Sequence, residues 1–346
     1  MVNTEFEIKC LKPKDEKRWN QFVMKNDSTT FYHQIGWKNA IQETYGHKPY
    51  YLFAENETGE IAGIFPLSYK NSPFVGKCLV SVAFAPYGGV CSDDDLVKKA
   101  LIDETIELGK KLDVDYCEFR CLEEIDTHRN MGHIRNHSAF HLDISKGHEY
   151  IWDNMNRNVR NRIRKGEKSN LKYEMDSNSD SIFTFYDIYA RTMKLLGTPV
   201  HDIKLFKNLL EQFPDNIFIA KANLDDRTVS AFYCLKFKDM LITAWGQSLH
   251  EYLKFAPNNF MYWNCVKHAS ENNLLRVDFG RSLVNSGHHT FKARWGCTEV
   301  PLNYYFYPPS KIVLPYLKYE KFTKFWNELP LSVVNKIGPK IRGEIP

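Results

Sequence analysis

Several features that mark other protein classes are missing from this sequence. No apolar run approaches the ~20 residues that span a bilayer, and the mean hydropathy is −0.45. The first residues lack the basic and apolar regions of a secretion signal. We therefore expect a cytoplasmic protein that has no membrane-spanning helix.

Motifs for several common chemistries are also absent. The sequence contains no G-x-x-x-x-G-K-[ST], G-x-G-x-x-G, H-E-x-x-H or G-x-S-x-G. A P-loop nucleotide site, a Rossmann-type redox site, a zinc protease of the zincin type and an α/β-hydrolase therefore all lack their local signature.

The cysteines and histidines do not form a metal-binding pattern. The eight cysteines are scattered, and no two form the C-x-x-C pair typical of structural zinc. Five histidines are crowded between positions 128 and 148, but no Asp, Glu or Cys accompanies them at matching intervals. We expect no metal and interpret this segment as a solvated loop and interdomain surface. The five are His128, His133, His137, His141 and His148.

The length and charge are more informative. With 346 residues, the chain is long enough for about two domains. A content of 43% hydrophobic and 25% charged residues is ordinary for a globular protein. The net charge is only +4, but between Arg157 and Lys172 there are seven basic residues and one acidic residue. This local concentration predicts an anionic partner.

Two hairpins of similar sequence indicate how the chain is organised. Strands are expected over residues 50–55 and 61–69, and again over 216–222 and 229–237. Their offset of about 167 residues indicates a duplicated domain rather than a solenoid repeat. We expect an α/β fold of two modules with mostly antiparallel sheets. The modules are residues 1–145, with a helical tail at 315–346 that breaks at Leu329-Pro330 and at Gly338-Pro339, and residues 146–314.

The strongest positive feature is a basic helix, expected over residues 149–169. Arginine suits phosphate because its planar fork binds two oxygens at once. A solvated helix face usually mixes both signs of charge, and this face does not, so phosphate contact and a plain solvated surface stay open as alternatives. The basic residues that share the face are Arg157, Arg160, Arg164, Lys165 and Lys168.

Two glycine-containing segments offer polar side chains for a site. The first follows an expected strand at 275–279 and brings Asp278, Arg281 and Lys292 near a strand end. These residues form either the rim of a pocket or a salt-bridge network that holds a loop. The second is a helix stop that presents Thr198 and His201 together.

Short motifs along nearly the whole chain resemble the FemAB-like aminoacyltransferases, specifically their exosortase-associated, acetyltransferase-like branch. The order of many short pieces carries this resemblance. The pieces are Tyr45-Gly46-His47-Lys48-Pro49, residues 62–67, Tyr87-Gly88-Gly89, residues 160–165, residues 197–201, Asp278-Phe279-Gly280-Arg281, and Phe291-Lys292 with Trp295-Gly296.

The resemblance implies two GNAT-like domains, with the C-terminal helices packing back on the first. It also implies transfer of an activated acyl group, typically an amino acid from aminoacyl-tRNA, to an amine of a peptide or cell-envelope precursor. The co-substrate is aminoacyl-tRNA or acyl-CoA, and no separate cofactor is implied. A peripheral contact with the membrane is compatible with such an acceptor.

Site residues follow from the same resemblance. Lys292 of the Phe-Lys-x-x-aromatic-Gly element lies at the transfer site, where it could stabilise an oxyanion. Asp278 or His201 could accept the proton of the amine, and the sequence does not choose between them. Relatives that act on nucleotide-linked precursors place a lysine four residues after a tryptophan. In this sequence the residue four positions after Trp37 is Ile41, which disfavours such an acceptor. Substrate contacts are expected from Arg157, Arg160, Arg164, Lys165, Thr198, Arg281, Phe291, Trp295 and Tyr87.

Two other functions are compatible with the same fold. A GNAT N-acyltransferase would use acyl-CoA and hold its pyrophosphate on backbone amides of a glycine-containing turn that opens a helix. The corresponding segment here, residues 255–260, contains no glycine, which favours aminoacyl-tRNA. The third alternative is a non-catalytic module that binds RNA or polysaccharide.

Overall fold

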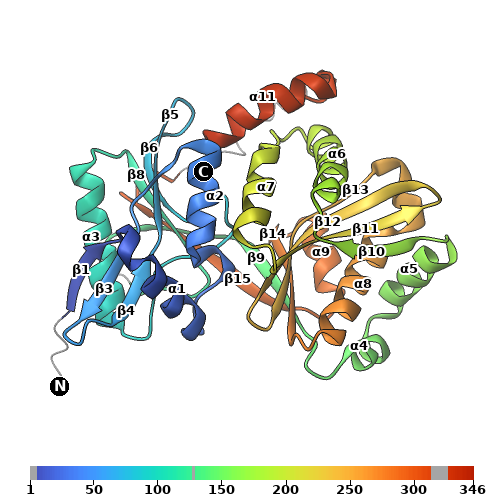
Figure 1. The fold of residues 1–346 in the computed structure, drawn as a ribbon, viewed down its shortest axis with the longest axis horizontal. Coiled ribbons are helices and arrows are strands. Elements are labelled where there is room, and N and C mark those ends of the chain that lie inside the picture. Colours follow the sequence, from blue (N-terminus) through green and yellow to red (C-terminus); the bar gives the residue numbers. More distant parts are fainter. Residues whose placement is uncertain (1–5, 127–128, 313–325) are drawn as a thin grey trace. The chain divides into compact units, whose positions relative to one another are not determined.

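Two compact units make up the chain (Figure 1). The computed structural model describes residues 6–126, 129–312 and 326–346. The first unit comprises Met1–Asn136, Pro301–Lys318 and Gly343–Pro346, and the second comprises His137–Val300 and Tyr319–Arg342. The sequence analysis placed the boundaries at 145 and 314 and assigned the tail to the first module. In the structure, only the last four residues of the described tail belong to the first unit.

The first unit is built from two groups of strands and the helices that pack on them. One sheet has the order β1-β3-β4-β7 and is antiparallel throughout. The other strands follow the order β15-β8-β6-β5-β2, in which β6 and β8 are parallel and the pairs β15–β8, β6–β5 and β5–β2 are antiparallel. The elements are β1 (Phe6–Cys10), α1 (Glu16–Lys25), α2 (Ile35–Tyr45), β2 (Lys48–Pro49), β3 (Leu52–Asn56), β4 (Ile61–Phe65), β5 (Leu67–Ser72), β6 (Gly76–Ser81), β7 (Cys91–Ser92), α3 (Asp95–Lys111), β8 (Tyr116–Cys121) and β15 (Thr298–Tyr307).

The expected hairpins are both present, with one correction. β3 pairs with β4, and β11 (Ile217–Leu224) pairs with β12 (Arg227–Phe237), each antiparallel and each with a register shift near its turn. The single strand expected over 61–69 is wrong, because β4 ends at Phe65 and β5 begins at Leu67 in the other sheet. Pro66 separates them, since a proline has no N–H to donate to a sheet.

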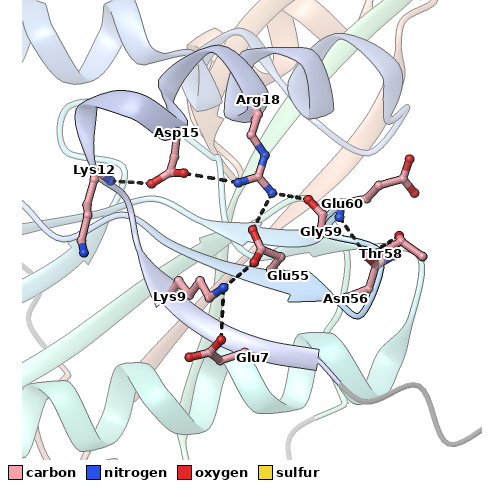
Figure 2. A network of polar contacts seen from close by, with 10 residues as sticks. All are labelled: Glu7, Lys9, Lys12, Asp15, Arg18, Glu55, Asn56, Thr58, Gly59 and Glu60. Atoms are coloured by element: carbon pink, nitrogen blue, oxygen red, sulfur yellow. Dashed lines mark hydrogen bonds and ion pairs between the residues drawn. The ribbon is translucent and has the colours of Figure 1, made fainter.

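A network of charged side chains ties the hairpin of the first unit to the strand and helix beside it (Figure 2). Glu55 on β3 accepts hydrogen bonds from Lys9 on β1 and from Arg18 on α1, the latter at 2.6 Å. Arg18 also donates to Asp15 at 3.3 Å and to the carbonyl oxygen of Gly59 in the β3–β4 turn. One carboxylate therefore connects three elements of the unit.

The second unit contains a six-strand array in the order β10-β11-β12-β13-β14-β9. Its neighbours are antiparallel except β13 and β14, which pair in parallel only from Met240 to Ile242 and from Arg276 to Asp278. Both strands continue beyond that point without pairing to each other, so they diverge. Besides β11 and β12, the array contains β9 (Gly132–Asp143), β10 (Lys172–Asp176), β13 (Met240–Ser248) and β14 (Arg276–Leu283).

Helices cover both faces of this array (Figure 1). Phe232 of β12 packs on Tyr262 of α8, while the next residue, Tyr233, packs on Phe206 of α7. Because successive residues of a strand point to opposite faces, α8 and α7 lie on opposite sides of the sheet. The helices are α4 (His148–Asn154), α5 (Arg157–Lys168), α6 (Ser179–Leu195), α7 (Ile203–Gln212), α8 (Pro257–Glu271), α9 (Gly287–Ala293) and α11 (Leu331–Gly343).

Three expectations for the second half need correction. The basic segment forms two helices rather than one, because Asn156 caps a new helix with its side chain bonded to the Asn158 N–H. The histidine-rich segment is not a loop: positions 132–143 form β9, and its spacing of four keeps His133, His137 and His141 on one face. Helix α11 continues through Pro339, so the expected break there is wrong.

Part of the tail and one histidine, His128, lie outside the described residues. Within the ranges that the structure does describe, no helix is long and apolar enough to cross a membrane. The same ranges contain no group of three or more His, Cys, Asp or Glu side chains placed to hold a metal ion.

Candidate active site

The site is centred on an irregularity of β14. Where the parallel pairing with β13 ends, the register with β9 also shifts, between Asp278 and Arg281. Gly280 in this bulge has a φ of 73°, a left-handed conformation that a residue with a Cβ rarely adopts. The bulge turns backbone groups of β14 away from the sheet and toward helix α9.

Lys292 fills the position opposite these backbone groups. It lies on α9, a helix capped by Ser286, whose hydroxyl accepts the His289 N–H at 3.2 Å. Its side-chain nitrogen Nζ donates to the carbonyl oxygens of Gly280 and Arg281, at 2.9 and 3.0 Å. Only 7% of the residue is exposed. Two carbonyls thus hold a buried ammonium group that has three donors, at the point where two strands diverge.

The surroundings of Lys292 act on its charge in opposite directions. The pKa of Lys292 is lowered to about 8, chiefly by burial; the charge of Asp278 acts to raise it and the nearby Arg281 to lower it. A lysine with this pKa is mostly cationic at neutral pH and loses its proton more readily than an exposed lysine. Perturbed groups of this kind mark candidate functional sites.

Asp278 lies in the same bulge and is completely buried. Its Oδ1 accepts the backbone N–H of Gly280 at 2.7 Å, which fixes the carboxylate against β14. Its Oδ2 lies 3.8 Å from Nε2 of His141 on the neighbouring strand β9. Arg281 of β14 is exposed. The structure therefore brings together Asp278, Arg281 and Lys292, as the sequence expected, and adds His141.

Aromatic side chains hold α9 in place. Tyr262 of α8 stacks on Phe279 with ring centroids 4.4 Å apart, and Trp295 packs edge-on against Phe279 at 5.3 Å. Phe291 lies 5.6 Å from Tyr262, again between centroids. Trp295 is 2% exposed, so its contact is with the core, whereas Phe291 also lines a groove.

That groove has a volume of about 740 Å³ and lies between α5, the start of α8 and the end of α9. This volume is within the range of small-molecule pockets. The charged residues that line it are Arg162, Lys165 and Arg294, and no acidic side chain joins them. Gly166 allows α5 to approach α8, since a Cβ there would meet the Phe260 Cβ at 2.8 Å. The groove is therefore suited to an anion.

The groove also includes the N-terminus of α8. The helix begins at Pro257, which has no N–H, followed by Asn258 and Asn259. Asn258 uses its side-chain oxygen to accept a hydrogen bond of 2.6 Å from Ser248. Phe260 is 5% exposed and packs into the core, so it does not crowd the groove.

The basic residues of α5 divide between two tasks. Arg160 donates to the carbonyl oxygens of Trp152 and Asp153, at 3.1 and 3.0 Å, and so satisfies the C-terminal end of α4. Arg164 lies over the Trp152 ring, 5.3 Å from its centroid. Lys165 lines the groove and Arg157 is exposed. Residues expected to share one binding face are thus partly engaged with α4.

His201 and Thr198 lie elsewhere in the second unit. His201 is 3% exposed, and its ring packs edge-on against Phe206 and Trp245 on the α7 side of the sheet. Burial holds the pKa of His201 well below its ordinary value. Thr198 is exposed, and its hydroxyl donates to the Leu196 carbonyl oxygen at 3.4 Å.

Tyr87 belongs to the first unit, where it is 2% exposed and its ring lies 5.3 Å from that of Tyr32. In the same unit Trp37 donates to the Ala83 carbonyl oxygen at 3.2 Å, and Ile41 is buried. Both positions are therefore parts of the core of this unit.

Sequence reasoning missed His141, Arg162 and Arg294. The signal for His141 was the alternation of Phe140, Leu142 and Ile144 with polar residues, which predicts a strand. Arg162 lies three residues before Lys165 and shares a helix face with it, although only Lys165 was among the basic residues expected to share the binding face. Arg294 carried no local signal, because only the fold brings the end of α9 to α5.

Comparisons with known proteins agree with this architecture. Residues 153–293 match the sequence model of the acetyltransferase (GNAT) domain. The chain is similar in structure to FemX, with a TM-score of 0.68 and 15% identity, covering 92% of this chain and 100% of FemX. It is also similar to the C-terminal domain of a putative lysylphosphatidylglycerol synthetase from Agrobacterium fabrum, with a TM-score of 0.56, 10% identity and coverage of 85% and 91%.

A third similar structure is a tandem GNAT protein from the clavulanic acid biosynthesis pathway, with a TM-score of 0.52, 10% identity and coverage of 87% and 98%. No curated protein sequence matches the chain. Within the second unit, residues 153–293 thus match a GNAT acetyltransferase domain. The whole chain has the α/β fold of FemX and of tandem GNAT proteins, as the resemblance in the sequence predicted.

Proposed function

We propose that this protein is an aminoacyltransferase that moves an activated amino acid from aminoacyl-tRNA to an amine of a peptide or cell-envelope precursor. The observation that carries the proposal is Lys292, a buried cation held by two backbone carbonyls where β13 and β14 diverge. A transfer enzyme needs a fixed positive group where negative charge develops, and a buried one is worth more than an exposed one.

The chemistry requires little beyond orientation and charge stabilisation. Amide formation from an ester and an amine is downhill, so holding the two reactants together supplies much of the acceleration. When the amine attacks, the ester carbonyl oxygen becomes an oxyanion, and the Lys292 ammonium group is the proposed stabiliser. The amine also loses a proton, for which Asp278 together with the side chains around it is the proposed destination.

The groove supports a polyanionic donor. Arg162, Lys165 and Arg294 line it without an acidic counterpart, and Arg157 and Lys168 continue the positive charge along the exposed side of α5. Charge that extends beyond the groove suits the repeated phosphates of an RNA end, because contacts to phosphate position a nucleic acid without reading its sequence. The similarity to FemX and to a putative lysylphosphatidylglycerol synthetase also favours an aminoacyl donor.

Acyl-CoA is the second candidate donor. The groove contains a helix N-terminus, the feature on which phosphates bind readily, and one similar structure is a tandem GNAT protein. Two observations weigh against it: Pro257 removes one amide, and no glycine opens the approach.

The proposal is tested by incubating the protein with charged tRNAs and, separately, with acyl-CoAs, in the presence of peptide and envelope-precursor amines. Mass spectrometry then detects the acylated amine. We expect transfer from aminoacyl-tRNA, lost in Lys292→Ala. Transfer from acyl-CoA alone would establish the second candidate, and RNA binding without any transfer would establish a non-catalytic module.

A further inference from the structure

We infer that His141 is the proton acceptor of the transfer reaction and that Asp278 is a positioning residue that acts through it. The inference rests on the proposed function and deepens it, because it assigns a role to a side chain that neither the sequence motifs nor the GNAT match singles out. It starts from the observation that Asp278, the expected base, has no exposed surface.

A base must touch the proton that it removes, at about 2.6–3.2 Å or through one water. Asp278 is 0% exposed, and its Oδ1 already accepts the Gly280 N–H at 2.7 Å. A substrate amine therefore does not reach this carboxylate directly. Its negative charge instead acts on the groups packed around it.

His141 is the group that faces Asp278 from the neighbouring strand. The two residues are direct partners in the antiparallel register of β9 and β14. His141 Nε2 is 3.8 Å from Asp278 Oδ2, within the range of an ion pair but too long for a hydrogen bond. The same Nε2 is buried and has no hydrogen-bond partner among the described residues.

The rest of the imidazole is accessible. The His141 side chain is 19% exposed, whereas its Nε2 is buried. The ring thus turns Nε2 toward the carboxylate and exposes other atoms to solvent. If the carboxylate holds the ring proton on Nε2, the lone pair on Nδ1 is left for the substrate. Catalytic hydrogen bonds often shorten when substrate binds.

His141 and the groove lie on opposite faces of the sheet. Its neighbours Phe140 and Leu142 belong to the core cluster with α8, and so do Val277 and Phe279 on either side of Asp278. Because side chains alternate along a strand, His141 and Asp278 point to the opposite face from α8. The cationic groove is on the α8 side, so donor and amine would meet from opposite faces.

The proposed step balances in atoms and charge. The nitrogen of the amine forms a bond to the ester carbon and gives one proton to His141 Nδ1. The bond from the ester carbon to the ribose oxygen then breaks, and the same proton passes to that oxygen as it leaves. The products are an amide and a free hydroxyl, and the imidazole returns to its neutral form.

Other charged groups lie near the pair. Asp278 and Arg281 face it from β14, His137 and Asp143 lie on its own strand, and Lys292 approaches from α9. Because Lys292 is held by carbonyl oxygens and not by the Asp278 carboxylate, removing His141 leaves the oxyanion group in place.

The first test compares turnover of His141→Gln, Asp278→Asn and the double variant, with His148→Gln as the control. His148 is a half-buried histidine of the same unit, bonded to Ser270. We expect each single variant to lose about 10²–10⁴-fold in turnover, and the double variant to lose no more than the worse single variant. Added imidazole should restore activity to His141→Gln only. If folded His141→Gln turns over as fast as the wild-type protein, and the wild-type protein does transfer the amino acid, the inference is overturned while the proposed function stands.

The second test needs no activity and therefore separates the inference from the proposed function. Nitrogen NMR of ¹⁵N-histidine-labelled protein distinguishes the two neutral imidazole tautomers. We expect wild-type His141 to carry its proton on Nε2, and Asp278→Asn to shift that preference, while His148 stays unchanged. A proton on Nδ1 in the wild type, or no response to Asp278→Asn, would contradict the inference.

Discussion

Two opposing contributions of similar size determine the free energy of the Lys292 cation: the cost of its burial and the gain from its hydrogen bonds. Burial lowers its pKa from the ordinary 10.5 to about 8, which corresponds to a penalty on the order of 3 kcal/mol for keeping the cation at neutral pH. Hydrogen bonds to the Gly280 and Arg281 carbonyl oxygens offset this penalty, since bonds from a charged donor contribute about 1.5–3 kcal/mol each. Such a residue is placed for its charge rather than for stability.

We predict that Lys292→Met lowers turnover by at least ~10²-fold, as expected for loss of one group that stabilises an oxyanion. Wild-type turnover should decline above pH 8, where Lys292 with its pKa of about 8 loses its proton. Lys204→Met, which removes an exposed lysine of α7, should keep both turnover and its pH profile. A folded Lys292→Met protein with near-wild-type turnover would contradict the role of this residue.

The stability of the same variant should depend on pH in a defined direction. Because the folded-state pKa of Lys292 is lowered to about 8, the unfolded chain binds more protons between that value and 10.5. The difference between the unfolding free energies of the wild type and of Lys292→Met should therefore change in favour of the wild type as pH increases from about 8 to 10.5. Chemical denaturation at pH 7 and pH 10 measures it, and an opposite slope would rule out a buried cation.

At the scale of elements, α5 serves both packing and binding. Val159, Ile163 and Gly166 form its buried face, Arg160 caps α4, and Arg162 and Lys165 reach the groove. The helix therefore offers two pairs of equal charge for comparison. Arg160 and Arg164 contact α4, whereas Arg162 and Lys165 line the groove.

We predict that Arg162→Gln/Lys165→Gln weakens RNA binding and lowers the slope of log K against log salt by about 0.7 for each lost phosphate contact. The matched double variant Arg160→Gln/Arg164→Gln should change the slope less and instead lower the unfolding free energy by about 1–3 kcal/mol, because two carbonyls at the end of α4 lose their donor. Equal slopes in both double variants and the wild type would assign α5 to the solvated surface.

The Glu55 network of the first unit allows a separate test. Hydrogen bonds from Lys9 and then Arg18 lower the pKa of Glu55, so its stabilising effect is present above the ordinary pKa and is lost as pH falls through the folded value. We predict that Glu55→Gln lowers the unfolding free energy at pH 7 by about 1–2 kcal/mol, with a smaller difference near pH 3. Glu57→Gln in the exposed turn should have no effect. A deficit in Glu55→Gln that does not change with pH would contradict the network's ionic character.

Local chemistry explains which elements the sequence could predict. The hairpins were predictable because alternation and turn residues specify them over a few positions. The strand over 132–143 is not evident from the sequence, because the apolar alternation at Phe140 and Leu142 covers only its end and histidines crowd the rest. The motif around Lys292 indicates that residue and its proximity to Asp278. The approach of His141 to Asp278 and of Arg294 to α5 could not be predicted, since tertiary packing pairs β9 with β14 and brings the end of α9 to the same groove as α5.

At the scale of the whole molecule, the chain combines a segment that matches a GNAT domain with a further unit that also contains an antiparallel hairpin, and its fold is similar to those of FemX and a tandem GNAT protein. The fold by itself does not choose a donor, because one fold supports several chemistries. The proposed choice of aminoacyl-tRNA over acyl-CoA rests on the charge of the groove and on the start of α8.

The most direct measurement is the pair of dissociation constants of the wild-type protein for an aminoacyl-tRNA and for CoA, determined side by side at one salt concentration. With Pro257 in place of an amide donor, we predict a CoA constant in the millimolar range or weaker, about −4 kcal/mol. Aminoacyl-tRNA should bind at micromolar concentration or better, and more weakly as salt increases. Micromolar binding of CoA together with no measurable binding of aminoacyl-tRNA would contradict the proposed donor.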